Sequence, residues 1–267
     1  MKKYLSVFKI SFQQEFAYRV NFIMWRIRNV LQLFLVFFLW DTVFSGQDKV
    51  IFGYDKARIL TYVFGLLIIR AFVLSARAVD VAGEVANGDL SNYLIKPVSY
   101  FKYWLTRDLS SKALNLIFAA FETAVLFIIL KPPFFIQTNI ISLTGFFVST
   151  ALAMFIYFTI LFISSAIPFW IPEVAWGAQF LTTAIFIEFL SGAVFPLDIL
   201  PQVFQNILNL TPFPYMIFFP LEVYLGKIAG LDLLKGVVIS FIWAIILWIG
   251  MNSLWKKGLK VYQSQGR

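Results

Sequence analysis

Residues 80–104 read DVAGEVANGDLSNYLIKPVSYFKYW and form the most polar segment between two long apolar runs. Gly88 is unfavourable inside a helix, because glycine loses more backbone entropy there than any other residue. Asp89 can then cap a new helix by accepting a hydrogen bond from its free N–H groups. Pro97 ends that helix, because the residue before a proline is pushed out of the α region.

The new helix is predicted to be short and amphipathic. Leu90, Tyr93 and Leu94 lie at positions i, i+3 and i+4, which places them on one apolar face. A helix of this kind, held between two membrane spans, has two natural partners: the bilayer surface or another protein.

The composition predicts a polytopic membrane protein. Of the 267 residues, 60% are hydrophobic and only 13% are charged, and the mean hydropathy is +0.82, whereas soluble domains carry roughly 25% charged residues. The net charge of +8 is better explained by basic cytoplasmic loops than by nucleic acid. The absence of Cys and His excludes disulfides, thiolate chemistry and His-bound metals. We therefore expect no metal site, cofactor or nucleic-acid partner.

Each apolar run is close to the ~20 residues that cross a hydrocarbon core, and only helices satisfy their own backbone there. The expected fold is an all-α polytopic membrane protein with six transmembrane helices, over 21–44, 57–79, 107–130, 140–167, 180–193 and 233–255.

Lys and Arg predict the orientation. If both termini are cytoplasmic, 15 of the 22 basic residues lie at the cytoplasmic ends of the spans and six at the outer ends. Positive charge favours the cytoplasmic side, so both termini and residues 80–104 are expected inside.

Two segments outside the spans have distinct patterns. Residues 1–20 are predicted to form an N-terminal interfacial helix, with Leu5, Phe8, Phe12 and Phe16 on one face. Residues 191–232 are apolar yet rich in proline, which interrupts helices. They are predicted to form an extracytoplasmic hairpin, either re-entrant or made of short helices. Its shape is assigned to four prolines: Pro196, Pro201, Pro212 and Pro214.

Three of the ionisable residues within the predicted spans are singled out, because such residues are paired or functional inside a membrane. Arg70 and Glu188 lie at similar depths and form a possible intramembrane pair, although Arg70 could instead extend to the inner surface. Glu122 faces either an aqueous path or the interface. Outside the spans, Glu84 is expected to pair with a cation on a partner or with charges near the N-terminus of this chain.

Two motifs carry a resemblance to a known family. The first is Glu84-x-x-x-Gly88-x-Leu90-x-x-x-Leu94-x-x-Pro97, after the second predicted span. The second is Phe195-Pro196-Leu197-x-x-Leu200-Pro201, followed by Thr211-Pro212-Phe213-Pro214-Tyr215 and Pro220-Leu221-Glu222-Val223-Tyr224-Leu225-Gly226, before the last span. Together with the six-span layout, they resemble the permease subunit of ABC-2 type exporters along the whole chain.

The resemblance implies a single transmembrane domain over residues 1–267, with a coupling segment at 80–104. It also implies a bacterial cell membrane location, pairing with a second permease copy or paralogue, and docking of each permease on a separate ABC ATP-binding subunit. ATPase coupling is assigned to seven residues: Glu84, Gly88, Asp89, Leu90, Tyr93, Leu94 and Pro97. The helix at 90–94 is then favoured to dock into the ATPase rather than lie on lipid. The chain lacks a phosphate-binding loop of the form G-x-x-x-x-G-K-[ST], so it is expected to be a transport subunit and not an enzyme.

Two other classes stay open. A membrane-embedded transferase is disfavoured because paired carboxylates and His or Cys clusters are lacking in the loops. An ion-coupled secondary transporter is disfavoured because there is no evident repeat and little midplane charge.

Overall fold

The computed structural model of the protein describes residues 2–17, 19–45 and 50–262. In these ranges the chain is helical without a β-strand, apart from an isolated bridge between Ile51 and Tyr54. Five helical stretches there are long and apolar enough to cross a membrane: 22–43, 56–74, 100–130, 140–169 and 230–261. The all-helical fold and five of the predicted spans are thus confirmed.

The elements that carry these spans are α2 (Arg19–Val43), α3 (Lys56–Ile69) continued by the π-helical η1 (Arg70–Leu74), α6 (Tyr100–Leu130), α7 (Ile140–Ser164) and α12 (Gly230–Val261). Local chemistry sets several ends. The Asp55 side chain caps α3 by accepting from Arg58 N at 2.7 Å, and Asn139 caps α7 by accepting from Ile141 N at 2.8 Å. Lys131 ends α6 in a left-handed conformation with φ 44°, followed by two prolines.

The fifth predicted span, 180–193, takes a different form in the structure. A helix runs through α8 (Ala175–Phe180), the π-helical η5 (Leu181–Ile187) and α9 (Glu188–Leu190), and it ends before Gly192, whose φ is +86°. The stretch starts earlier and ends sooner than the sequence predicted, and it is not among the five long spans.

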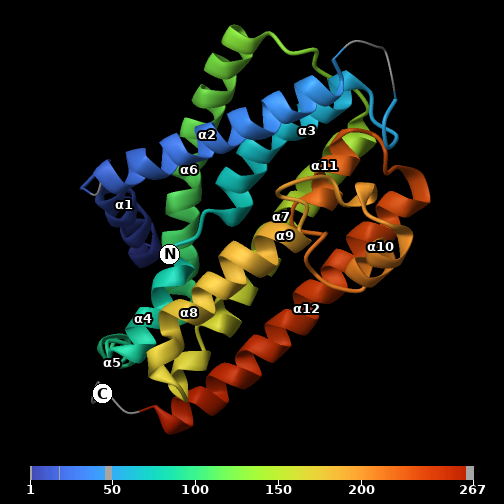
Figure 1. Ribbon diagram of the computed structural model, residues 1–267. Helices are drawn as coiled ribbons and strands as arrows, with labels where there is room; N and C mark the ends of the chain where they lie inside the picture. The colour runs from blue at the N-terminus through green and yellow to red at the C-terminus, as the bar shows by residue number, and fades with distance from the viewer. Residues whose placement is uncertain (1, 18, 46–49, 263–267) are drawn as a thin grey trace.

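Shorter elements connect the spans. After η1 come η2 (Ala78–Asp80), α4 (Val81–Ala86) and α5 (Ser91–Leu94). After α7 come η3 (Ile167–Phe169) and η4 (Pro172–Val174). After α9 come η6 (Leu197–Ile199), α10 (Gln202–Asn209) and α11 (Phe218–Tyr224). Figure 1 shows α4 and α5 at one end of the molecule, near the last turns of α12, and α10 toward the opposite end.

The helix α1 (Lys2–Ala17) packs along α6, where Ser110 Oγ donates to Phe8 O at 3.0 Å. Leu5 and Ile10 remain more than half exposed. The side chain of Phe16 lies outside the described part of the structure.

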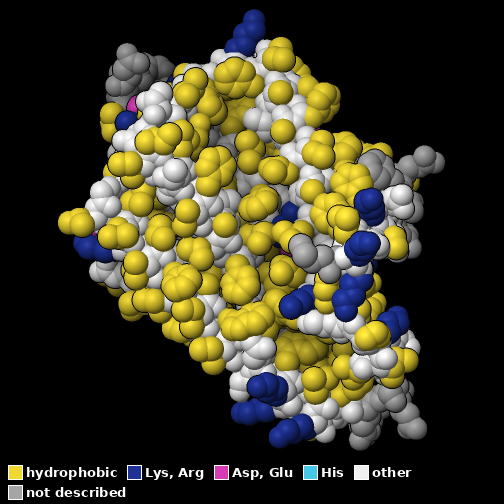
Figure 2. Space-filling view, turned by 180° about the vertical axis from the view of Figure 1, so that it is seen from behind, with side chains coloured by type: hydrophobic (Ala, Val, Ile, Leu, Met, Phe, Trp, Pro, Cys, Tyr) yellow, Lys and Arg dark blue, Asp and Glu magenta, His cyan; other side chains and the backbone are white. Residues whose placement is uncertain are grey.

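The spans differ in burial. In the most apolar 18-residue stretch of each span, 61% of the residues are buried in α3–η1 and 56% in α7, but only 17% in each of α2, α6 and α12. Figure 2 shows a wide face covered by hydrophobic side chains, with many of the visible Lys and Arg side chains toward the end that carries α1, α4 and α5. Such an apolar outer surface suits contact with lipid.

Several helix boundaries differ from the predicted spans. The second ends at Leu74 rather than at 79, the third begins at Tyr100 rather than at 107, and the last covers 230–261 rather than 233–255. The sequence also predicts that the aromatic residues at 100–104 face the membrane interface, where Trp and Tyr are enriched. Trp104 is instead fully buried, and the Tyr100 hydroxyl donates to Glu84 at 2.7 Å.

Candidate functional site

A buried ion pair on α6 holds the break that follows the second span. Lys112 Nζ donates to Val73 O at 2.9 Å and also contacts Ser75 O, while Asp108 Oδ1 accepts from Arg77 N at 2.8 Å. Lys112 Nζ and Asp108 Oδ2 lie 3.3 Å apart, and both side chains are almost completely buried. These bonds satisfy backbone groups that a broken helix would otherwise leave unpaired.

The Arg77 side chain joins the same break to the N-terminal helix. Its Nε donates to Glu15 Oε1 at 2.6 Å, and Glu15 is buried. The segment after η1 is therefore bonded to both α6 and α1, so its movement would displace both helices.

The coupling segment begins with α4 and turns at Gly88, whose φ of +84° favours glycine. The Glu84 carboxylate accepts hydrogen bonds from the Tyr93 hydroxyl at 3.0 Å and from the Tyr100 hydroxyl at 2.7 Å. Burial raises the pKa of Glu84 above its ordinary value, and the two tyrosine bonds oppose this shift. Glu84 is thus held by tyrosines of its own chain, which sequence reasoning did not anticipate.

The predicted apolar docking face is split. Leu90 is fully buried in the core, whereas Leu94 is 51% exposed and the next residue, Ile95, is 84% exposed. The prediction that Leu90, Tyr93 and Leu94 share one outward face is therefore wrong.

The expected cap is also absent. Leu90, and not Asp89, is the residue before α5; its backbone is already helical, and no side chain caps the helix. Pro97 lies in the turn before α6, where its carbonyl accepts from Lys3 Nζ at 2.7 Å. The outward tip of the segment is consequently formed by Leu94, Ile95 and Lys96, all exposed.

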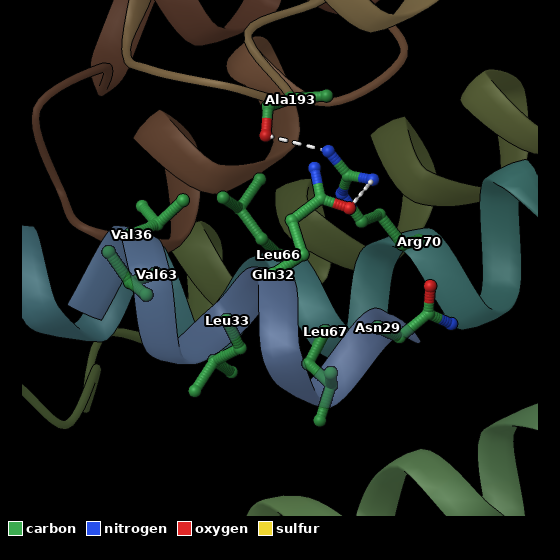
Figure 3. A pocket seen from close by; sticks show the side chains of 9 residues that line it. All are labelled: Asn29, Gln32, Leu33, Val36, Val63, Leu66, Leu67, Arg70 and Ala193. Carbon is green, nitrogen blue, oxygen red and sulfur yellow. Dashed lines mark hydrogen bonds between the residues drawn. The ribbon is translucent and has the colours of Figure 1, made fainter. Parts of the chain in front are cut away.

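The structure brings Arg70 and Glu188 together. Arg70 Nη2 lies 2.5 Å from Glu188 Oε1 and donates to Ala193 O at 2.8 Å. Gln32 completes the cluster: its Nε2 donates to Glu188 Oε1 at 3.0 Å, and its Oε1 accepts from Arg70 Nη1 at 3.3 Å. Figure 3 shows Gln32 and Arg70 beside a hollow between α2 and α3, with Ala193 above them.

Both ionisable residues of this cluster, Arg70 and Glu188, lie at π-helical segments, which occur frequently at functional sites. Arg70 opens η1, and Glu188 directly follows η5. The two π-helical segments therefore lie directly at Arg70 and Glu188, the two members of the pair.

A second intramembrane pair was missed from the sequence. Arg26 Nε donates to Glu122 Oε1 at 2.7 Å, and both side chains are largely buried. Arg26 is one of the 15 basic residues that were counted at the cytoplasmic ends of the spans. The available signal was the spacing of Arg26, Asn29 and Gln32, which puts three polar side chains on one stripe of an otherwise apolar helix.

The proline-rich segment forms short helices. Pro196 precedes η6, and Pro201 begins α10, where its carbonyl accepts from Phe204 N at 2.9 Å. Pro212 and Pro214 lie in the turn between α10 and α11, and Pro214 O accepts from Phe219 N at 2.9 Å. We call η6 and α10, residues 197–209, the outer hairpin arm, after the side of the membrane on which the sequence predicts this segment.

Four polar side chains fasten this arm. The Tyr54 hydroxyl lies 3.0 Å from Asp198 Oδ1 and 2.5 Å from Glu222 Oε1. Lys227 Nζ pairs with Asp198 and lies 3.3 Å from Glu222 Oε2 and 3.3 Å from the centre of the Tyr54 ring. Sequence reasoning recorded Glu222 only as part of a motif, and nothing local linked it to Tyr54.

No group of three or more acidic side chains in the described ranges is arranged to hold a metal ion. The site has three features: an exposed tip at 94–96 at one end, the ion pairs Arg70–Glu188 and Arg26–Glu122 within the helices, and the polar cluster around Glu222 at the other end.

Comparison of the sequence with curated proteins gives no match. A family model described as "ABC-2 family transporter protein" matches residues 30–266, and the chain therefore belongs to this family of membrane transport proteins.

Proposed function

We propose that this chain is the permease subunit of an ATP-binding cassette exporter, which forms the translocation path and docks on a separate ATPase subunit. Membership of a transporter family supports the transport role. The observation that carries the docking is the tip at 94–96, where Leu94 is 51% and Ile95 is 84% exposed although Leu90, beside them, is fully buried.

The tip suits a protein groove because it is short, apolar and rigidly mounted. Tyr93 packs against Tyr100 at 5.3 Å and against Tyr103 at 5.1 Å between ring centres. Glu84 bonds Tyr93 and Tyr100 from the side of α4. A small apolar anchor on a stiff base loses little entropy on docking.

A displacement of the tip would be transmitted to the membrane helices through direct packing contacts. α4 packs against α8 and η3, and η2 packs against α7. Lys112 and Asp108 join the break before η2 to α6. ATP-driven closure of the ATPase would thus displace several spans as rigid bodies.

In this proposal the helix at 175–190 serves as the fifth of six spans, with a kinked π segment. Both termini and the tip are cytoplasmic, and the outer hairpin arm closes the path on the other side. A second copy or a paralogue of the chain completes the path. Apart from Arg26, which pairs with Glu122, 14 of the 22 basic residues are expected at the cytoplasmic ends, and this bias supports the orientation.

Co-purification tests the proposal. The chain is isolated from native membranes in mild detergent, and the bound proteins are identified by mass spectrometry. A partner with a phosphate-binding loop should be recovered with the wild-type chain and should rebind after separate purification. Recovery of the intact chain with no ATP-binding partner would overturn the assignment.

A further inference from the structure

The fastening of the outer hairpin arm joins four separate segments. Tyr54 follows the turn after residue 50, Asp198 lies in η6, Glu222 in α11, and Lys227 in the turn after α11. Glu222 is only 2% exposed. A carboxyl group this deep must be matched by its partners or carry a proton.

Counting hydrogens shows that the cluster is short of one donor when both acids are ionised. The Tyr54 hydroxyl has one proton but lies within hydrogen-bond distance of both Asp198 Oδ1 and Glu222 Oε1. It can donate to only one of them. If Glu222 carries a proton, Glu222 donates to Tyr54 Oη, and Tyr54 donates to Asp198.

The charge balance leads to the same state. Lys227 is the one cation in contact with the two acids among the described residues. With both acids ionised the cluster carries a net charge of −1, and with Glu222 protonated it is neutral. Tyr62 also faces the cluster from α3, but its hydroxyl donates to Gly192 O at 2.7 Å. Other pairs at this end, Asp55–Arg58 and Asp41–Lys56, are each closed and partly exposed.

We propose that Tyr54, Asp198, Glu222 and Lys227 form a proton-dependent latch, which holds the outer hairpin arm closed when Glu222 is protonated and releases it when that proton leaves. This deepens the proposed function, on which the outward placement of the arm rests.

The direction of the pH effect follows from the environment of Glu222. Burial raises its pKa from 4.5 to about 7, and the nearby Asp198 adds to the shift, while Lys227 and the bond with Tyr54 oppose it. In the released state, exposed to water, the pKa returns toward 4.5. The closed state is therefore favoured fully below pH 4.5, and this advantage is lost as the pH rises through about 7.

A contrast in exposure along α10 makes release of the arm measurable. A hollow beneath α10 is lined by Leu197, Asp198, Gln205, Leu208, Asn209 and Phe218. Leu208 faces this hollow and is 9% exposed, whereas Val203 on the same helix is 68% exposed. Release of Asp198 would uncover Leu208 without unfolding α11, which is packed against α7 and α3.

Cysteine labelling measures this release directly, because the chain contains no natural cysteine. Leu208→Cys and Val203→Cys are prepared separately in nanodiscs and labelled with a maleimide from pH 6 to pH 8. Val203→Cys reports the intrinsic pH dependence of the thiol, so the informative quantity is the ratio of the two rates. With the pKa values above, this ratio should rise about tenfold over the range.

Two variants in the Leu208→Cys background complete the test. Glu222→Gln removes the titrating group and should give a low ratio that is independent of pH. Tyr54→Phe removes the hydroxyl shared by the two acids and should raise the ratio at pH 6 toward the wild-type value at pH 8. A wild-type ratio that is equal at pH 6 and pH 8 would refute the latch, as would a full rise in Glu222→Gln. The assay needs neither ATP nor a partner, so the latch and the ATPase-docking proposal can fail independently.

Discussion

The exposed tip of the coupling segment can be removed with little damage to the fold, because its two apolar side chains point away from the core. We predict that Leu94→Ala/Ile95→Ala reaches the membrane at normal abundance but binds the ATPase subunit weakly. Fully burying a side chain of this size is worth roughly 1.5–3 kcal/mol. Scaled by the 51% and 84% of each side chain that is free to be buried, the pair contributes about 2–4 kcal/mol. At 1.4 kcal/mol per factor of ten, binding should weaken by about 30- to 1,000-fold.

The affinity is measured between the nanodisc-embedded permease and the purified ATPase subunit by a surface-binding assay. A matched control is Leu231→Ala/Leu234→Ala, which removes two side chains that are 74% and 58% exposed at the opposite end of the molecule. The control should bind like the wild type. Unchanged affinity of the tip variant, with normal thermal stability, would show that the tip is not the docking element.

Three further predictions concern the fold and the charges. Single cysteines at Asn92 and Gln202, both exposed, should be labelled by an impermeant reagent from inside and outside the cell respectively; the reverse pattern would invert the topology. Leu90→Ala should lower stability by about 2–5 kcal/mol, as buried Leu truncations do, yet leave ATPase affinity unchanged once folded, as checked by thermal melting and binding. Arg70→Met should cost about 3–5 kcal/mol by leaving Glu188 buried and unpaired, and the double variant Arg70→Met/Glu188→Met should recover most of this loss in the same melting assay; additive losses would argue against the pair.

The spans were predictable because each is set by a local signal of apolar length, which survives any tertiary arrangement. The boundary errors have long-range causes. The second span ends at Leu74 because Lys112, on another helix, accommodates the free carbonyls of Val73 and Ser75. A single-sequence pattern holds no information on a partner nearly 40 positions away.

The polar segment at 80–104, predicted to be the coupling segment, begins between the second and third long helices, but its exposed face was not predicted. Periodicity showed that Leu90 and Leu94 lie near one another on a helix, yet it could not show which one would pack against the core. Packing buries Leu90 completely and leaves Leu94 and Ile95 exposed. The Asp89 cap was a reasonable local inference that the tight turn after Gly88 replaced.

Within the membrane, the Arg70–Glu188 pair was anticipated as one of two alternatives, whereas the Arg26–Glu122 pair was missed. An ion in hydrocarbon needs a partner, and Arg70 has few candidates, which made Glu188 a natural choice. The outer cluster gives no such constraint, because Tyr54, Asp198 and Lys227 would each be unremarkable if exposed to water. Only the fold shows that they surround a buried carboxyl group.

The α3 helix and its π-helical extension connect these features. Its inner end meets the break held by Lys112, and Arg70 joins it to Glu188 at membrane depth. Toward the other end, the Tyr62 hydroxyl donates to Gly192 O, and the side chain of Leu221 on α11 leaves no space for a Cβ at Gly65. This span is also the most buried of the five, so in the proposed mechanism a shift at one end would displace the helices packed around it. A push at the tip would thus reach α11 and Glu222 through α3 as one packed unit, and a change in the protonation of Glu222 would act back along the same helix.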